Sequence, residues 1–222
     1  MQYFLEKVFP TLLGTLTGAV LAFGVKKYQD QEAESARQKG AALVALFTIT
    51  QYLNYLLTLE QHLAEWRDPK HQEAVWLGVP ELWDFTELPE MKISDLAFLL
   101  QDRDPNLLGA LVMTYQKVVN LAGSIQRRNE QKLRAKNAFE ASPGFTVASA
   151  WPDPVKAAKG ILHERLQIEL QLSAESVLES SHRTLTYCQK VGRDLEFFLN
   201  RTWPDENFPS LPKELPGVAP LL

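Results

Sequence analysis

The sequence predicts an all-α protein, in which an N-terminal transmembrane helix continues into a long three-helix antiparallel bundle. Three observations lead to this fold class. Residues 8–25 form a run without any charged side chain. Three later segments repeat apolar residues at spacings of three and four, the period of one helix face. No stretch of useful length alternates apolar and polar residues as a half-buried strand does.

The first predicted element is a helix that crosses a membrane. The run VFPTLLGTLTGAVLAFGV lies between Lys7 and Lys26, and as a helix it extends about 27 Å, close to the thickness of the hydrocarbon core. A cleaved secretory signal is one alternative, but the run is longer than a usual signal core and two lysines follow it directly. A buried helix of a soluble domain is the other alternative. We expect an uncleaved anchor over residues 1–27.

Basic residues flank this helix unequally. Only Lys7 precedes it closely, whereas Lys26, Lys27, Arg37 and Lys39 follow it. Cytoplasmic flanks carry the excess of lysine and arginine. The asymmetry predicts a single-pass protein of the cell membrane with its N-terminus outside and its main domain in the cytoplasm.

Two glycines, Gly14 and Gly18, lie one turn apart on one face of the predicted span. Small residues at this spacing let two membrane helices approach closely. The pair predicts helix packing in the membrane and hence a homo-oligomer.

The bundle is expected over residues 28–200. Residues 28–39 are polar on all sides and predict a solvated helix. The next segment has an apolar seam that ends near Asp68-Pro69. If the helix runs through Gly40, the bundle has three helices of similar length; if Gly40 is a turn, it has four. Residues 40–59 also lack charge, so a second span is an alternative, although Gln51 and Asn54 disfavour it. The seam consists of Leu46, Ile49, Leu53, Leu56 and Leu63, with Glu60 at the remaining position.

Two Asp-Pro pairs, Asp104-Pro105 and Asp153-Pro154, predict the starts of the other long helices. Aspartate is a favoured N-cap and proline is favoured at the first helical position. We expect helices over 105–140 and from 154 to about 200. The predicted apolar faces are Leu108, Leu111, Tyr115, Val118, Ala122 and Ile125 in the first, and Leu178, Leu185, Cys188, Leu195 and Leu199 in the second.

Basic side chains gather near the end of the 105–140 helix. In an antiparallel bundle this helix returns toward the membrane, so we expect its cations beside the anionic leaflet or the acidic residues that follow the span. A solvated basic face near a helix C-terminus is the alternative. The predicted membrane-proximal set is Lys26, Lys27, Arg127, Arg128, Lys132 and Arg134.

Residues 68–104 form a long connection that contains Trp76, Trp83 and Phe85. We expect it to cap the end of the bundle far from the membrane, with a short helix near residues 93–100. Its aromatic side chains form either a plug for the bundle core or a partner surface. The tail, residues 201–222, is rich in proline and is expected to be extended, either draped on the bundle or offered to another protein.

The sequence contains no phosphate-binding glycine loop, dinucleotide fingerprint, nucleophile elbow, paired cysteine motif or HExxH. Glu179 and His182 form an ExxH pair of the kind found in di-iron bundles, but a second pair is missing from the sequence. Cys188 lies on an apolar face and is expected to be a buried, inert thiol. The net charge of −4 argues against nucleic-acid binding. We expect no enzyme activity, cofactor or metal.

These features predict a non-enzymatic scaffold, adaptor or assembly subunit held at the membrane, which acts through an unidentified protein partner. A membrane-perturbing effector, whose helical domain senses a signal, is the alternative.

Overall fold

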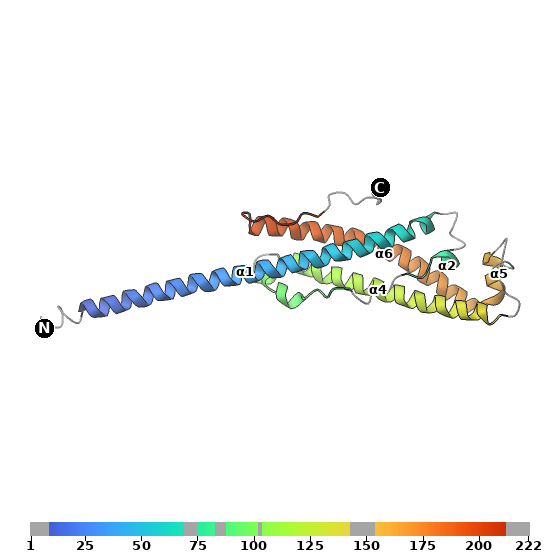
Figure 1. Ribbon diagram of the computed structural model, residues 1–222, viewed down its shortest axis with the longest axis horizontal. Coiled ribbons are helices and arrows are strands. Elements are labelled where there is room, and N and C mark those ends of the chain that lie inside the picture. The colour runs from blue at the N-terminus through green and yellow to red at the C-terminus, as the bar shows by residue number, and fades with distance from the viewer. Residues whose placement is uncertain (1–8, 69–74, 83–87, 102–103, 143–153, 212–222) are drawn as a thin grey trace. The chain divides into compact units, whose positions relative to one another are not determined.

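The computed structural model describes residues 9–68, 75–82, 88–101, 104–142 and 154–211 (Figure 1). Across these residues all regular structure is helical and no strand occurs, as predicted. The chain divides into two compact units, Met1–Val44 and Ala45–Leu222. The elements are α1 (Phe9–Leu63), the 3-10 helix η2 (Ala64–Arg67), α2 (Val75–Gly78), the 3-10 helix η4 (Ile93–Leu96), α3 (Phe98–Gln101), α4 (Pro105–Glu140), α5 (Pro154–Ile161) and α6 (Glu164–Thr202).

Helix α1 passes through Gly40 without a break, so this glycine is a helical residue and not a turn. In the first unit, every residue from 21 to 37 is exposed. Arg37 donates to Glu34 at 3.0 Å, one helical turn away. This exposure agrees with the solvated helix that the polar composition of residues 28–39 predicts.

In the second unit, α6 runs antiparallel to both other long helices. Glu60 near the end of α1 pairs with His182, whereas Ile49, about three turns earlier, lies beside Gly192. Similarly, Lys117 of α4 lies over the Tyr187 ring. Farther along α4, Ala135 shares a buried cluster with Leu170. The Ala45–Leu63 part of α1 therefore runs in the same direction as α4, which differs from our expectation that α4 returns antiparallel to it.

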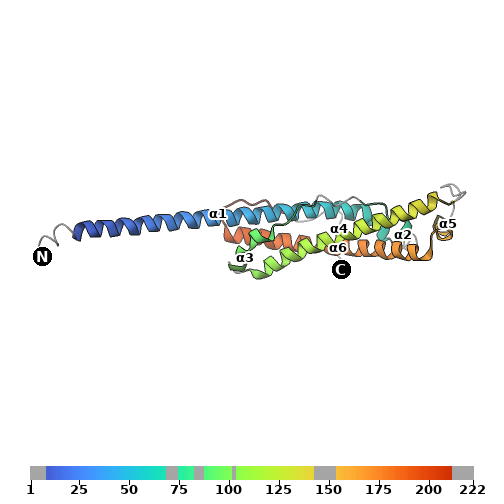
Figure 2. The same ribbon diagram turned by 90° about the horizontal axis from the view of Figure 1, so that it is seen from below.

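The connection between α1 and α4 explains this difference. It does not only cap one end of the bundle but returns along its length. The backbone N–H and carbonyl of Leu82 both form hydrogen bonds with the Asn129 side chain, and Tyr52 donates to the Pro89 carbonyl at 2.6 Å. Farther along the connection, the Phe98 ring lies against the Phe198 ring. The chain thus re-enters the bundle at the end where the second unit begins. Figure 2 shows α3 near the start of α4, and α2 near the opposite end.

Helix α4 begins where the Asp-Pro signal predicts. The Asp104 side chain accepts from the Leu107 backbone N–H at 3.1 Å, and Pro105 is the first helical residue. Leu111, Val118 and Ile125 are buried as predicted, whereas Leu107, Thr114 and Leu121 are buried in place of their predicted neighbours Leu108, Tyr115 and Ala122. The buried residues of α4 are Leu107, Leu111, Thr114, Val118, Leu121, Ile125, Arg128 and Ala135.

The predicted third helix is two helices. Helix α5 ends at Ile161, and His163 adopts extended backbone and caps α6 by accepting from the Arg165 N–H at 3.2 Å. On α6, Leu185, Cys188, Leu195 and Leu199 are buried as predicted, whereas Leu178 is only partly buried. Helix α6 continues to Thr202, two residues beyond the predicted end, and is followed by a turn at residues 203–206 in which the Glu206 N–H donates to the Trp203 carbonyl at 3.2 Å. Residues 207–211 have no regular structure and lie on the bundle.

Candidate functional site

The first candidate site is the apolar part of α1. Among residues with described side chains, α1 contains one segment long and apolar enough to cross a membrane, with a mean hydropathy of 1.5 over eighteen residues. Half of that window is buried. The charges between Lys26 and Lys39 place the window in the second charge-free run, residues 40–59, whose apolar side chains include buried Leu46, Ile49 and Leu53. This run therefore supplies core side chains to the bundle.

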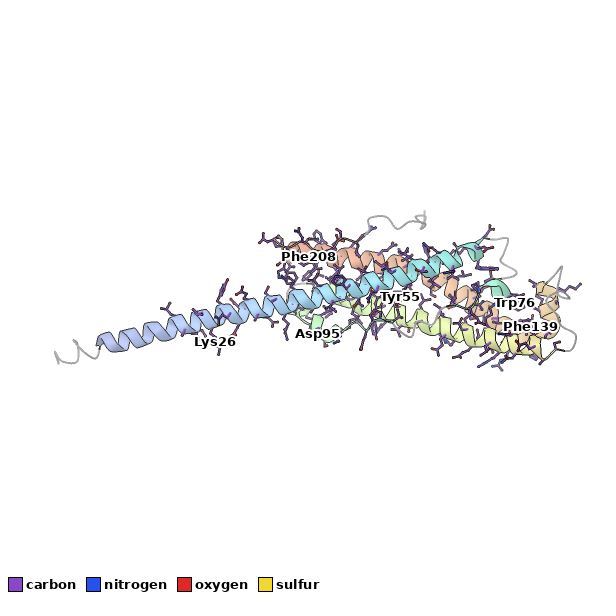
Figure 3. The ribbon with its side chains drawn as sticks, in the orientation of Figure 1. Lys26, Tyr55, Trp76, Asp95, Phe139 and Phe208 are labelled. Carbon is purple, nitrogen blue, oxygen red and sulfur yellow. The ribbon has the colours of Figure 1, made fainter. Side chains whose placement is uncertain are left out.

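The first charge-free run, residues 8–25, is helical from Phe9 onward. Its last apolar side chains, Leu21, Phe23 and Val25, are exposed by 65%, 72% and 58%. Lys26 and Lys27 follow them and are exposed as well. Figure 3 shows Lys26 on this part of α1. Gly14 and Gly18 lie within α1, in the part whose side chains are outside the description.

The structure places some residues of the predicted basic set on the surface and others in the interior. Arg127 and Arg134 are exposed on α4, but Arg128 is fully buried. Its Nη2 donates to the carbonyls of Val79 at 2.8 Å and Trp76 at 3.4 Å. The prediction of a membrane-proximal role is therefore wrong for Arg128, because its side chain points into the core and holds backbone of the connection.

Lys132 acts one turn later in the same way, and its Nζ donates to the Leu77 carbonyl. The two cations thus satisfy carbonyls around the end of the four-residue helix α2, where cations are favoured. We call them the Arg128/Lys132 pair. Lys132 is partly buried, so the expectation of a solvated or lipid-facing ammonium fails here too.

Burial has an electrostatic cost for this pair. Burial lowers the pKa of Arg128 to about 10, and burial together with the neighbouring Arg128 charge lowers the pKa of Lys132 to about 8. Within the described residues, Nε and Nη1 of Arg128 have no hydrogen-bond partner, and neither does Oε1 of Gln131. The pair therefore holds the connection at the expense of a poorly compensated buried charge.

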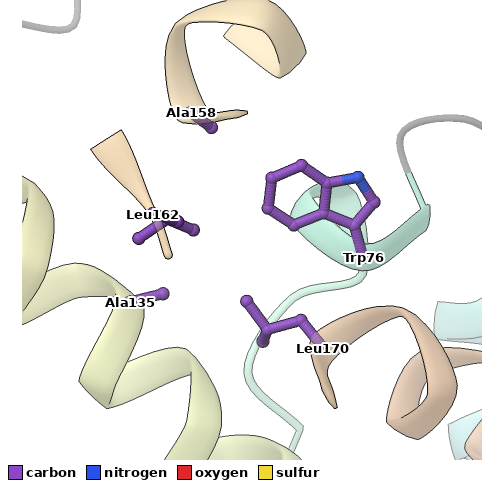
Figure 4. Packing of buried hydrophobic residues seen from close by; sticks show 5 residues of the cluster. All are labelled: Trp76, Ala135, Ala158, Leu162 and Leu170. Carbon is purple, nitrogen blue, oxygen red and sulfur yellow. The ribbon is translucent and has the colours of Figure 1, made fainter. Parts of the chain in front are cut away.

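Trp76 lies in the core and not on a partner surface. It is 4% exposed and packs with Ala135, Ala158, Leu162 and Leu170 (Figure 4). For this residue the plug interpretation agrees with the structure, because α4, α5 and α6 enclose the indole. Trp83 and Phe85 fall outside the described residues.

A polar network joins α1, η2 and α6 at the predicted gap in the apolar seam. Both carboxylate oxygens of Glu60 accept from Arg67 Nη2, Oε1 at 2.8 Å and Oε2 at 3.0 Å, and Oε2 also lies 3.4 Å from His182 Nδ1. Arg67 also donates to Ser181 at 3.1 Å. Glu179 pairs instead with Arg183. The ExxH residues therefore have separate partners, and within the described residues no three His, Cys, Asp or Glu side chains form a group that would hold a metal ion.

A groove of about 470 Å³ lies beside this network. Its lining includes Trp66, Arg67, Gln171, Glu175 and Glu179. The lining has both charge signs and one indole, so it does not select one chemical class of ligand.

Cys188 is fully buried, and burial raises the pKa of its thiol to about 12. Such a thiol stays protonated and unreactive at neutral pH, as its apolar position predicts.

No protein-family model, no curated protein and no solved structure matches the chain.

Proposed function

We propose that the chain is a single-pass membrane protein whose helical second unit works by binding other proteins, as a scaffold, adaptor or assembly subunit. One observation carries this proposal: the charge-free run of α1 ends in exposed Leu21, Phe23 and Val25 and is followed by two exposed lysines. Exposed apolar side chains on all sides of a helix are stable in lipid but costly in water.

The second unit supports the binding role through its construction. It buries long apolar faces on three helices, and it closes both of its ends with side chains from the connection and the tail. In this proposal the anchor confines the unit to the cytoplasmic surface of the cell membrane, and Gly14 and Gly18 assemble copies through the span. The enzymatic alternative has no motif in the sequence to support it.

Labelling from outside the cell tests the location and the orientation together. Cys188→Ala removes the native thiol, and Ser176→Cys places one thiol at an exposed position of α6. In membrane fractions we expect an impermeant maleimide to label this cysteine only after the cells are permeabilised, and Cys188→Ala alone to remain unlabelled. Recovery in the soluble fraction, or labelling in intact cells, would contradict the proposal.

A second candidate function is a membrane-perturbing effector, which the Gly14 and Gly18 pair in the proposed span favours. This function predicts that expression stops growth and that replacing both glycines with leucine restores it. Harmless expression of the unchanged chain would favour the scaffold.

A further inference from the structure

The tail of the chain occupies a small site on the second unit. Gly192 of α6 is buried, and a Cβ placed on it would lie 2.5 Å from Cδ1 of Leu211 and 3.1 Å from Cγ2 of Ile49. The missing side chain at Gly192 therefore leaves the space that Leu211 fills. Leu211 is 9% exposed although it lies in a segment without regular structure.

A carboxylate beside this space binds one side-chain donor and one backbone donor of the same segment. Glu196, one turn after Gly192, accepts from the Ser210 hydroxyl at 2.6 Å and from the Leu211 N–H at 3.2 Å. Both oxygens of the carboxylate are used, one by each donor. We call Ile49, Gly192 and Glu196 the Gly192 notch. It recognises a residue with a hydroxyl side chain that is followed by leucine. The leucine side chain fills the space at Gly192, and the hydroxyl and the leucine N–H donate two charge-assisted hydrogen bonds to Glu196.

The segment reaches the notch through an aromatic turn. The Trp203 ring packs against Phe198 at 6.2 Å and against Phe208 at 6.4 Å between centroids, and Figure 3 shows Phe208 near the end of α6. Residues 203–209 link α6 to the two residues in the notch, and seven residues span at most about 25 Å when fully extended. The notch of a second copy that lies within this distance of the end of α6 can therefore receive the segment.

We propose that the Gly192 notch is a peptide-binding site, filled by the tail of its own chain and able to accept Ser210 and Leu211 of a second copy. An exchanged tail makes the same contacts as a tail in its own chain, so exchange costs little contact energy. The exchange between copies rests on the proposed function, because a shared membrane holds copies side by side in one orientation. The site itself does not depend on that function.

A labelled peptide tests the site with the full chain in detergent micelles. The probe is WPDENFPSL, residues 203–211, with a fluorophore at its N-terminus and an amidated C-terminus. Leu211→Asp in the full chain releases the attached tail, which competes at an effective concentration on the order of millimolar. We expect this variant to bind the probe at least about tenfold more tightly than the unchanged chain, as measured by fluorescence anisotropy.

Two controls make this result specific. Adding Glu196→Ala to the Leu211→Asp chain should weaken binding by about tenfold, since both hydrogen bonds to the segment are lost. A probe with aspartate in place of leucine should not bind. Equal binding by the unchanged chain and the Leu211→Asp chain, no effect of Glu196→Ala, or no binding to any variant would overturn the site.

Mixed copies test the exchange. The Leu211→Asp chain has an intact notch, and the Glu196→Ala chain has an intact tail that its own notch holds about tenfold less tightly. With fluorophores at Ser176→Cys in a Cys188→Ala background, we expect more energy transfer in the mixture than in either variant alone. Pairing through Gly14 and Gly18 would contribute equally to all three samples. Equal transfer would refute exchange, and neither outcome depends on where the chain resides in a cell.

Discussion

The two ends of the second unit are closed by different chemistry. At one end, Trp76 fills the core and the Arg128/Lys132 pair holds the carbonyls around α2. At the other end, the rings of Phe98, Phe198, Trp203 and Phe208 pack in succession, and Leu211 fills the Gly192 notch. The first end is fastened by buried cations and the second mainly by apolar surface.

This difference sets the energetic character of each end. Aromatic and aliphatic burial stabilises without a compensating charge penalty. A buried cation must recover its lost hydration through hydrogen bonds, and Arg128 leaves two of its nitrogens without partners in the described structure. We therefore expect the α2 end to depend strongly on Trp76 and to tolerate, or gain from, the loss of charge.

The largest effect is expected from Trp76→Ala. It removes the largest side chain of the buried cluster, and large-to-small changes of an aromatic core residue cost about 3–5 kcal/mol. Urea denaturation in detergent, followed by helical circular dichroism, measures the change in the free energy of unfolding. Phe139→Ala, at a partly buried position of the same cluster, is the matched control and should cost clearly less. A loss no greater than that of the control would show that the indole does not hold this end together.

Two substitutions at Arg128 separate the effect of its charge on stability from the effect of its side-chain volume. Arg128→Ala leaves a cavity and unpaired carbonyls, so we expect a loss of about 2–3 kcal/mol. Arg128→Met keeps most of the volume without the charge but leaves the same carbonyls without their donor, so we expect a clearly smaller loss than for alanine. The same denaturation measurement applies to both. If methionine destabilises as much as alanine, the buried guanidinium is a net stabiliser and the contrast between the two ends is incorrect.

The local signals in the sequence predict much of this fold. Asp104-Pro105 marks the start of α4, and the apolar spacing from Leu46 to Leu63 marks the last part of α1. These features depend on residues within one helical turn of each other, where backbone capping and side-chain spacing decide the structure. The break before His163 was missed because histidine is a less common N-cap and no proline or glycine follows it.

The long-range features were missed for a different reason. Charge patterning places Arg128 and Lys132 on a surface, since isolated cations are rarely buried. Their burial depends on carbonyls about 50 residues earlier, which no local pattern links to them. The direction of α4 depends likewise on the path of the connection. At the Gly192 notch, only an unexplained glycine on a buried face signals the site.

The pH dependence of stability should report on Lys132. Its folded-state pKa is lowered to about 8 by burial and by Arg128, from an ordinary value of 10.5, while Glu81 acts in the opposite direction. Below pH 8 the lysine is charged in both states and the full penalty is present. Between pH 8 and 10.5 the unfolded chain binds more protons than the folded one, so stability rises with pH by an amount on the order of 2 kcal/mol.

Lys132→Met isolates this contribution. Burial raises the pKa of Tyr52 and of Cys188, so these groups lower stability at high pH in both chains and largely cancel in the difference. We expect the free energy of unfolding of the unchanged chain, relative to Lys132→Met, to rise between pH 8 and 10.5. If the difference in the free energy of unfolding does not change with pH, water reaches the ammonium group. This end of the unit is then more hydrated than its packing implies.

The smallest effect is expected at the opposite end, from Glu196→Ala. The carboxylate is partly exposed and holds only the tail, so its two hydrogen bonds should contribute about 1 kcal/mol to the free energy of unfolding. Hydrogen exchange gives the sharper measurement, because the Leu211 amide should lose protection while the amides of α6 around Cys188 keep theirs. Asp194→Ala, an exposed carboxylate on the same helix, is the matched control. If α6 loses protection together with the tail, the tail and the core of this end unfold as one cooperative unit. The tail would then not be released on its own.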